Sequence, residues 1–135
     1  MPYIRQRITI VTIKKPSEKN INQELQWLGN SLGLFSLRDR DKSCFRLFIE
    51  LLKSAKRDRA LSSDELAEKL DLSRGTIIHH VNRLIESGIV IHEGKKYMLR
   101  VDNLSTLISE VEKDFKRALD DLMEIAKDID DRLRL

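Results

Sequence analysis

The stretch Ser62–Arg100 constrains the fold more than any other part of the chain. It begins with Ser62–Glu65 (Ser-Ser-Asp-Glu), which matches a capping box. In this motif the hydroxyl of Ser62 accepts a hydrogen bond from the backbone amide of Glu65, and the carboxylate of Glu65 accepts one from the backbone amide of Ser62. A helix over about 63–70 is expected to follow. Asp71–Ser73 then forms a tight turn whose serine caps a second helix, about 74–87. Two helices joined by so short a turn predict a helix-turn-helix.

A β-hairpin is predicted directly behind the second helix. Gly88 stands where a left-handed C-cap is expected, and two strand-like runs, 89–92 and 96–101, flank the glycine turn Glu93–Lys95. Lysines at the tip can reach a phosphate or a minor groove. A helix-turn-helix followed at once by a basic-tipped hairpin is typical of a winged helix. That fold commonly sets its second helix into the DNA major groove, although some winged helices bind proteins or RNA.

The second helix has two different faces. Ile77, Val81 and Leu84 recur at the spacing of one helix face and are expected to pack on the earlier helices. The other face and the hairpin tip make the predicted DNA-binding set: Ser73, Arg74, Gly75, Thr76, Ile78, His79, Asn82, Arg83, Lys95 and Lys96. The alternative for each single residue is an ordinary solvated surface.

Several of these side chains suit particular contacts with DNA. Arg74 and Thr76 are placed for phosphates or base edges, and an exposed Ile78 suits a thymine methyl group. Asn82 suits adenine, and Arg83 suits guanine or a phosphate. The glycine between Arg74 and Thr76 would let a DNA backbone approach closely.

Residues 1–37 are predicted to form an N-terminal strand–helix extension. Residues 3–13 are rich in β-branched residues that partly alternate, which predicts a strand that either extends the wing's sheet or pairs with its copy in a dimer. Ser17 or Asn20 can open a helix over about 18–32, which Gly33 would end.

Residues 38–101 are predicted to be the winged helix-turn-helix domain. Asp39 or Asp41 can cap its first helix, about 41–57, whose apolar stripe includes Cys44. Because this is the only cysteine, no disulfide can form within the chain, and a lone thiol fits a reducing cytosol. No run of residues approaches the length of a membrane span, so we expect a cytoplasmic protein without membrane contact.

Residues 102–135 are predicted to form one helix of roughly thirty residues, about 45 Å long. Its apolar residues follow alternating steps of four and three, which favours a coiled coil with a second copy of the chain. The alternatives are a larger bundle that includes the 18–32 helix, or a helix folded back on its own domain. The predicted dimerisation set is Leu104, Ile108, Val111, Phe115, Ala118, Leu122, Ile125 and Ile129.

Charge is distributed unevenly along the chain. Residues 1–37 carry five basic and two acidic side chains (+3), residues 38–101 fourteen and ten (+4), and residues 102–135 six and ten (−4). A polyanion would therefore meet the first two segments and avoid the last.

The segment Leu72–Val90 resembles the arsenical-resistance-repressor (ArsR-like) winged-helix regulators, particularly archaeal members. The family's His-Leu, Leu and Gly-Leu-Val positions are occupied by His80-Val81, Leu84 and Gly88–Val90, and the resemblance covers about residues 41–101. It implies that positions 73–83 contact DNA and that the flanking helices make a homodimer. Ile78 departs from the family, which usually has a small polar residue there.

Metal sensing is not expected, although relatives of this kind can bind metals. The helix after residue 102 has no histidine or cysteine, and His79 and His80, being adjacent, point about 100° apart on a helix. We therefore expect no metal and no cofactor.

The sequence as a whole predicts a mainly α protein with a small β-wing: a winged helix-turn-helix domain, a long C-terminal dimerisation helix and an N-terminal strand–helix extension. The expected function is a sequence-specific, double-stranded DNA-binding transcriptional regulator that acts as a homodimer. The alternative is a protein-interaction subunit of the transcription machinery without its own DNA site. No glycine-rich phosphate loop or nucleophile elbow is present, so an enzyme is not expected. The sequence identifies no small-molecule effector.

Overall fold

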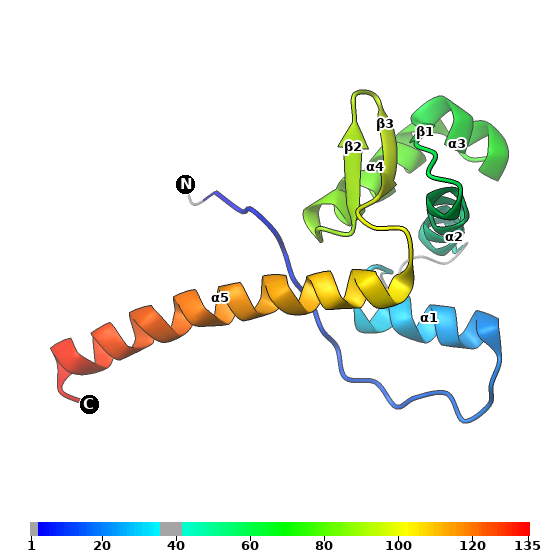
Figure 1. Ribbon diagram of the computed structural model, residues 1–135. Helices are drawn as coiled ribbons and strands as arrows, with labels where there is room; N and C mark the ends of the chain where they lie inside the picture. The colour runs from blue at the N-terminus through cyan, green and yellow to red at the C-terminus, as the bar shows by residue number, and fades with distance from the viewer. Residues whose placement is uncertain (1–2, 36–41) are drawn as a thin grey trace.

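A computed structural model describes residues 3–35 and 42–135. Figure 1 shows α2, α3, α4 and the strands grouped on one side of α5, which extends well beyond them. The elements are α1 Ile21–Ser31, α2 Ser43–Lys56, β1 Leu61–Ser62, α3 Ser63–Leu70, α4 Arg74–Glu86, β2 Val90–Glu93, β3 Lys96–Leu99 and α5 Leu104–Leu133. The predicted mainly helical fold with a small wing and a long C-terminal helix is confirmed.

The caps of the helix-turn-helix form as the sequence predicts. Ser62 Oγ accepts from the amide of Glu65 at 3.1 Å, and Glu65 Oε1 accepts from the amide of Ser62 at 3.3 Å. Ser73 Oγ accepts from the amide of Thr76 at 3.1 Å at the start of α4. Gly88 has φ of 82° just past its end, a conformation that favours glycine. With these caps, α3 and α4 begin and end within one residue of the bounds predicted from the sequence.

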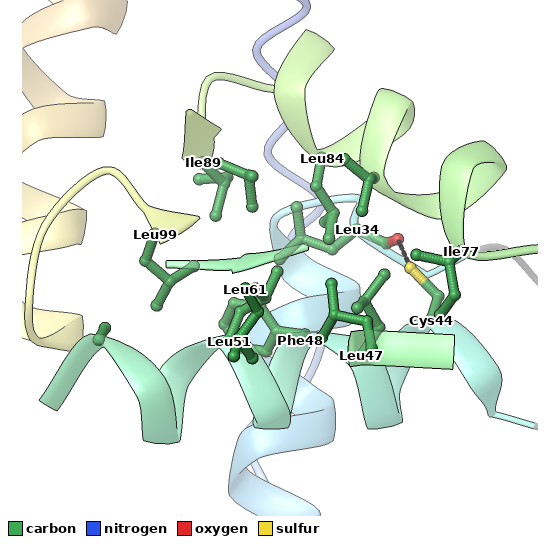
Figure 2. Packing of buried hydrophobic residues seen from close by; sticks show 14 of the residues in the cluster. Leu34, Cys44, Leu47, Phe48, Leu51, Leu61, Ile77, Leu84, Ile89 and Leu99 are labelled. Atoms are coloured by element: carbon green, nitrogen blue, oxygen red, sulfur yellow. Dashed lines mark hydrogen bonds between the residues drawn. The ribbon is translucent and has the colours of Figure 1, made fainter. Parts of the chain in front are cut away.

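The hydrophobic core is built around α2. Figure 2 shows Leu47, Phe48 and Leu51 of α2 meeting Ile77 and Leu84 of α4. Full burial of such a side chain contributes roughly 1.5–3 kcal/mol, so these contacts hold the helices together. The same core also takes in Leu34 from the segment after α1, Leu61, Ile89 and Leu99 around the sheet, and Leu107 and Val111 of α5.

The wing has one more strand than the sequence predicted. The sheet is antiparallel with the order β1-β3-β2, and Leu61 of β1 pairs with Tyr97 of β3. The hairpin itself closes through Gly94 and Lys95, with Glu93 opposite Lys96 and Gly94 at φ 62°. β1 was missed because it has only two residues, the second of which is the helix cap Ser62, and so short a strand carries no alternation that sequence reasoning can detect.

The predicted strand over residues 3–13 is wrong. The segment is extended but forms no ladder, and it makes two separated backbone hydrogen bonds: Arg7 N to Glu86 O at 2.9 Å and Val11 N to Ser31 O at 2.7 Å. Both acceptors are carbonyls at helix C-termini, which are left without partners inside their own helices. The β-branched residues therefore give an extended chain that bonds to helix ends and not to a neighbouring strand.

The first two helices agree with the sequence in their positions. Asn20 caps α1 by accepting from the amide of Gln23 at 3.1 Å, and Gly33 follows the helix with φ 68°. Asp39 and Asp41, the candidate caps of α2, lie outside the described residues. The N-cap of α2 is Lys42, which has φ 56° and makes no capping bond through its side chain.

Candidate nucleic-acid interface

The α4 helix presents one face to the core and one outward. Ile77, Val81 and Leu84 are fully buried, as predicted, and His80 joins them with its Nε2 2.6 Å from Ser43 Oγ of α2. The exposed positions in and beside α4 are Ser73, Arg74, Gly75, His79, Asn82 and Glu86, while Thr76, Ile78 and Arg83 are half-buried. Most of the predicted α4 set thus lies on one accessible stripe, and Ile78 is less exposed than expected.

The first turn of α4 is open toward solvent. Arg74 lies 3.8 Å from Asp64 in an ion pair whose side chains are 71% and 79% exposed, so this contact holds the guanidinium only weakly. A Cβ on Gly75 would meet no atom within 4 Å. Packing inside the protomer therefore does not require glycine at this position, which leaves space above the helix for an external backbone.

The far end of the exposed stripe contains an acid that the sequence pattern did not single out. Glu86 follows Gly75, His79 and Asn82 at helical spacing and is exposed. Its carboxylate accepts from Arg7 Nε at 2.5 Å, and the backbone amide of Arg7 bonds to the Glu86 carbonyl. The N-terminal segment thereby opposes the only negative charge on this stripe, a contact that no local pattern in the sequence reveals.

The wing tip lies beside the start of α3. Lys95 and Lys96 are both exposed, and Lys96 pairs with Ser62 across the sheet. The backbone hydrogen bond from Ser62 lowers the pKa of Glu65, with smaller contributions from Arg59 and Lys96. Arg59 also lies 2.9 Å from the Glu65 carboxylate. The two wing lysines and the ion-paired Arg59, from distant parts of the chain, thus lie around the start of α3.

A buried carboxylate of α5 joins Arg100, just after the wing, to the N-terminal segment. The side chain of Asp114 is 3% exposed and accepts from Arg100 through both oxygens, from Arg117, and from Gln6 Nε2 at 2.9 Å. Hydrogen bonding from Arg100 holds the pKa of Asp114 below its ordinary value, with help from Gln6 and from the charge of Arg117. Sequence reasoning missed this Asp114 cluster. The one sign of it in the sequence is the position of this acidic residue. It stands three residues after Val111 and four before Ala118, which is the spacing of the apolar face of the helix.

The predicted dimerisation residues divide into two groups. Val111 is buried in the core of the protomer, and Leu104 and Ala118 are half-buried. Leu107, which was not in the predicted set, is fully buried beside them. The remaining members are exposed: Ile108, Phe115, Leu122, Ile125 and Ile129.

The described part of the chain holds neither a metal-ligating cluster nor a membrane span. Within residues 3–35 and 42–135, no group of three or more His, Cys, Asp and Glu side chains could hold a metal ion. No helix in the same ranges is long and apolar enough to cross a membrane.

A tight helix pair, an outward-facing second helix and a basic-tipped hairpin define a winged helix-turn-helix domain. Residues 49–91, from the second half of α2 into β2, match the family model described as winged helix-turn-helix DNA-binding. The fold and this match therefore agree on a winged helix-turn-helix domain within the chain. No curated protein and no solved structure gives a significant match.

Proposed function

We propose that this protein is a sequence-specific, double-stranded DNA-binding transcriptional regulator that acts as a homodimer. The observation that carries the proposal is the exposed stripe of α4. Arg74, His79 and Asn82 lie along it, and its one acid, Glu86, is paired with Arg7. A stripe without a free negative charge suits the negative surface of a major groove.

In this proposal α4 enters the major groove and the wing follows the adjacent backbone or minor groove. Asn82 and Arg83 contact base edges, with Arg83 less accessible because it is half-buried. Lys95 and Lys96 contact phosphates. A two-fold dimer would place two α4 helices in successive major grooves, about 34–36 Å apart.

Selection of bound sequences from a random double-stranded DNA pool tests the function directly. We expect an enriched, inverted-repeat motif with half-sites one helical turn apart. Binding to that motif should weaken steeply as salt rises, because bound lysines and arginines release counterions. Recovery of no motif, together with salt-independent binding, would contradict the proposal.

A protein-interaction role is the second candidate, and one observation favours it. The second half of α5 exposes a row of apolar side chains that includes Leu122, Ile125 and Ile129. A row of this kind suits a partner helix. If the working surface were this row alone, the protein would form stable complexes with another protein and enrich no DNA motif.

The narrower assignments belong to the same proposal. The resemblance of Leu72–Val90 supports an ArsR-like subtype of archaeal type without metal ligands. We also propose that the protein works in the cytoplasm, that it is not an enzyme and that it needs no cofactor.

A further inference from the structure

A small polar cavity lies where the N-terminal segment crosses the ends of α1 and α4. Two backbone hydrogen bonds fix the segment there: the amide of Arg7 donates to the last carbonyl of α4 at 2.9 Å, and the amide of Val11 donates to the last carbonyl of α1 at 2.7 Å. Thr9, between these two bonds, packs against Gly33, where a Cβ would lie 2.7 Å from Thr9 Cγ2. The cavity formed by this crossing has a volume of about 130 Å³.

Two arginines from different elements line this cavity. Arg7 comes from the N-terminal segment and Arg83 from the last turns of α4. Arg83 is half-buried, and no group in the described part of the chain accepts a hydrogen bond from its guanidinium. Among the described residues Arg7 bonds to Glu86 through Nε only, which leaves its two terminal nitrogens for a ligand. Removing a cation from water without a counter-charge costs free energy, and an anion in the cavity would offset that cost.

We propose that this cavity binds a phosphate group, held between Arg83 and Arg7 with a hydrogen bond from the hydroxyl of Thr9. Guanidinium groups match the geometry of phosphate oxygens. A phosphate monoester presents three acceptor oxygens and a charge of about −1.5 to −2 at pH 7, which suits two guanidinium groups and a hydroxyl together. The cavity is several times larger than the roughly 30 Å³ that a water molecule occupies in the liquid, so it has room for one such group.

One acidic residue in the lining, Glu86, opposes an anion. Its carboxylate is paired with Arg7, and two arginines against one glutamate leave the lining with a charge of +1. The last carbonyls of α1 and α4 carry the negative ends of the helix dipoles, but both already accept backbone hydrogen bonds from the N-terminal segment. The cavity therefore remains favourable for a small anion.

The phosphate group has two possible sources, a free phosphate or the backbone of bound DNA. The link to DNA rests on the proposed function, in which α4 enters the major groove. Arg83 cannot hold a phosphate in the cavity and reach a base edge at the same time. A free phosphate would therefore compete with DNA, whereas a backbone phosphate would make Arg83 a contact that carries no sequence information.

Titration of the full chain with inorganic phosphate, without DNA and at constant ionic strength, tests the site itself. We expect the backbone amide signals of Arg7, Thr9 and Gly33 to shift together in the nuclear magnetic resonance spectrum. Arg83→Gln should weaken phosphate binding at least about tenfold, because a hydrogen bond between charged groups is lost. Arg57→Gln is the matched control, since it removes the same charge from an exposed arginine at the end of α2.

Two smaller changes keep the test informative if Arg83→Gln disturbs folding, which circular dichroism checks. Thr9→Val removes only the hydroxyl and should weaken phosphate binding about fivefold, while Thr9→Ser keeps the hydroxyl and should bind like the wild type. Glu86→Gln removes the opposing charge and should tighten binding about threefold.

The selected DNA motif distinguishes the two sources. If the site takes a free phosphate, replacing chloride by phosphate at equal ionic strength should weaken DNA binding by the wild type but not by Arg83→Gln. If it takes a backbone phosphate, free phosphate should shift none of the three amide signals. Thr9→Val should then weaken binding to all DNA sequences alike, about fivefold, without changing the preferred motif.

Two results would overturn the proposal. One is a phosphate titration without shifts at this site together with DNA binding that Thr9→Val leaves unchanged. The other is an equal loss of phosphate binding in Arg83→Gln and Arg57→Gln, which would mean attraction by net charge alone. Because the titration uses no DNA, failure to recover any DNA motif would contradict the proposed function and leave a measured phosphate site standing.

Discussion

The side chain of Gln6 fills the space that a Cβ on Gly88 would need. That Cβ would lie 2.2 Å from Gln6 Nε2, which donates to the carbonyl of Ser87 at 3.1 Å and to Asp114. The N-terminal segment is thus held against the end of α4 and against α5 by one amide. The turn from α4 into the wing leaves room for that amide only because residue 88 is glycine.

Gly88→Ala should therefore destabilise the protein by about 1–3 kcal/mol, because alanine is strained at φ 82° and displaces Gln6. Urea unfolding measures the change in the free energy of unfolding. Gly75→Ala is the matched control, since its Cβ meets nothing and alanine favours a helix. The control should keep or raise stability while weakening DNA binding. Equal losses of stability in both variants would contradict this explanation.

Asp114→Asn should destabilise the fold by about 1–3 kcal/mol at neutral pH, because it takes the charged acceptor from Arg100. The pKa of Asp114 is lowered in the folded state, so its contribution is full above the ordinary value of 3.8 and is lost as pH falls through the lowered pKa. Unfolding measured from pH 7 down to about pH 2 should show the wild type losing this contribution below about pH 4. The variant, which has no carboxyl there, should show a shallower loss, and parallel curves would contradict the assignment.

Arg7→Ala should weaken DNA binding more than it affects folding. The Arg7–Glu86 pair is mostly exposed, so its removal costs stability only about 0–1 kcal/mol. It leaves the carboxylate of Glu86 unopposed on the α4 stripe. Adding Glu86→Gln should recover affinity if repulsion by that charge is the cause. Binding isotherms at fixed salt make the comparison, and no recovery in the double variant would point to a direct phosphate contact by Arg7.

Asn82→Ala should relax sequence preference at one position of the motif, at a cost of about 1–3 kcal/mol on the preferred site. The side chain is exposed on α4, so its loss should leave stability within about 0.5 kcal/mol. Competition between the preferred site and single-base variants measures the preference. A uniform loss over all sequences would instead make Asn82 a backbone contact.

Replacing Lys95 and Lys96 together by alanine should weaken binding to all sequences alike. The salt dependence should also become shallower, by about one in the log–log slope for each phosphate that a lysine no longer neutralises. Lys53→Ala with Lys56→Ala, two exposed cations in the last turn of α2, is the control that keeps the net charge equal. An identical change in slope from both pairs would mean that the wing makes no specific phosphate contact.

Sequence reasoning was most successful where structure depends on neighbours in the chain. Ser62 and Glu65 satisfy amides three residues away, and Gly88 and Gly94 adopt positive φ at the two turns where glycine was expected. It failed for residues 3–13, because their β-branched composition sets an extended conformation but not its hydrogen-bond partner. Partners come from elements distant in sequence, here the C-terminal ends of α1 and α4.

The sequence by itself determined the helix-turn-helix, its caps, the hairpin and the length of α5, because each follows from contacts within a few residues. Only the tertiary structure decided which side of α5 is buried and that Gln6, Arg100 and Asp114 meet in one cluster. Ser62–Arg100 contains its own turns and caps, so its local pattern predicts its shape. The Asp114 cluster brings together residues up to 108 positions apart. The spacing of residues along one helix cannot encode such a contact, because it depends on how separate elements pack against a common core.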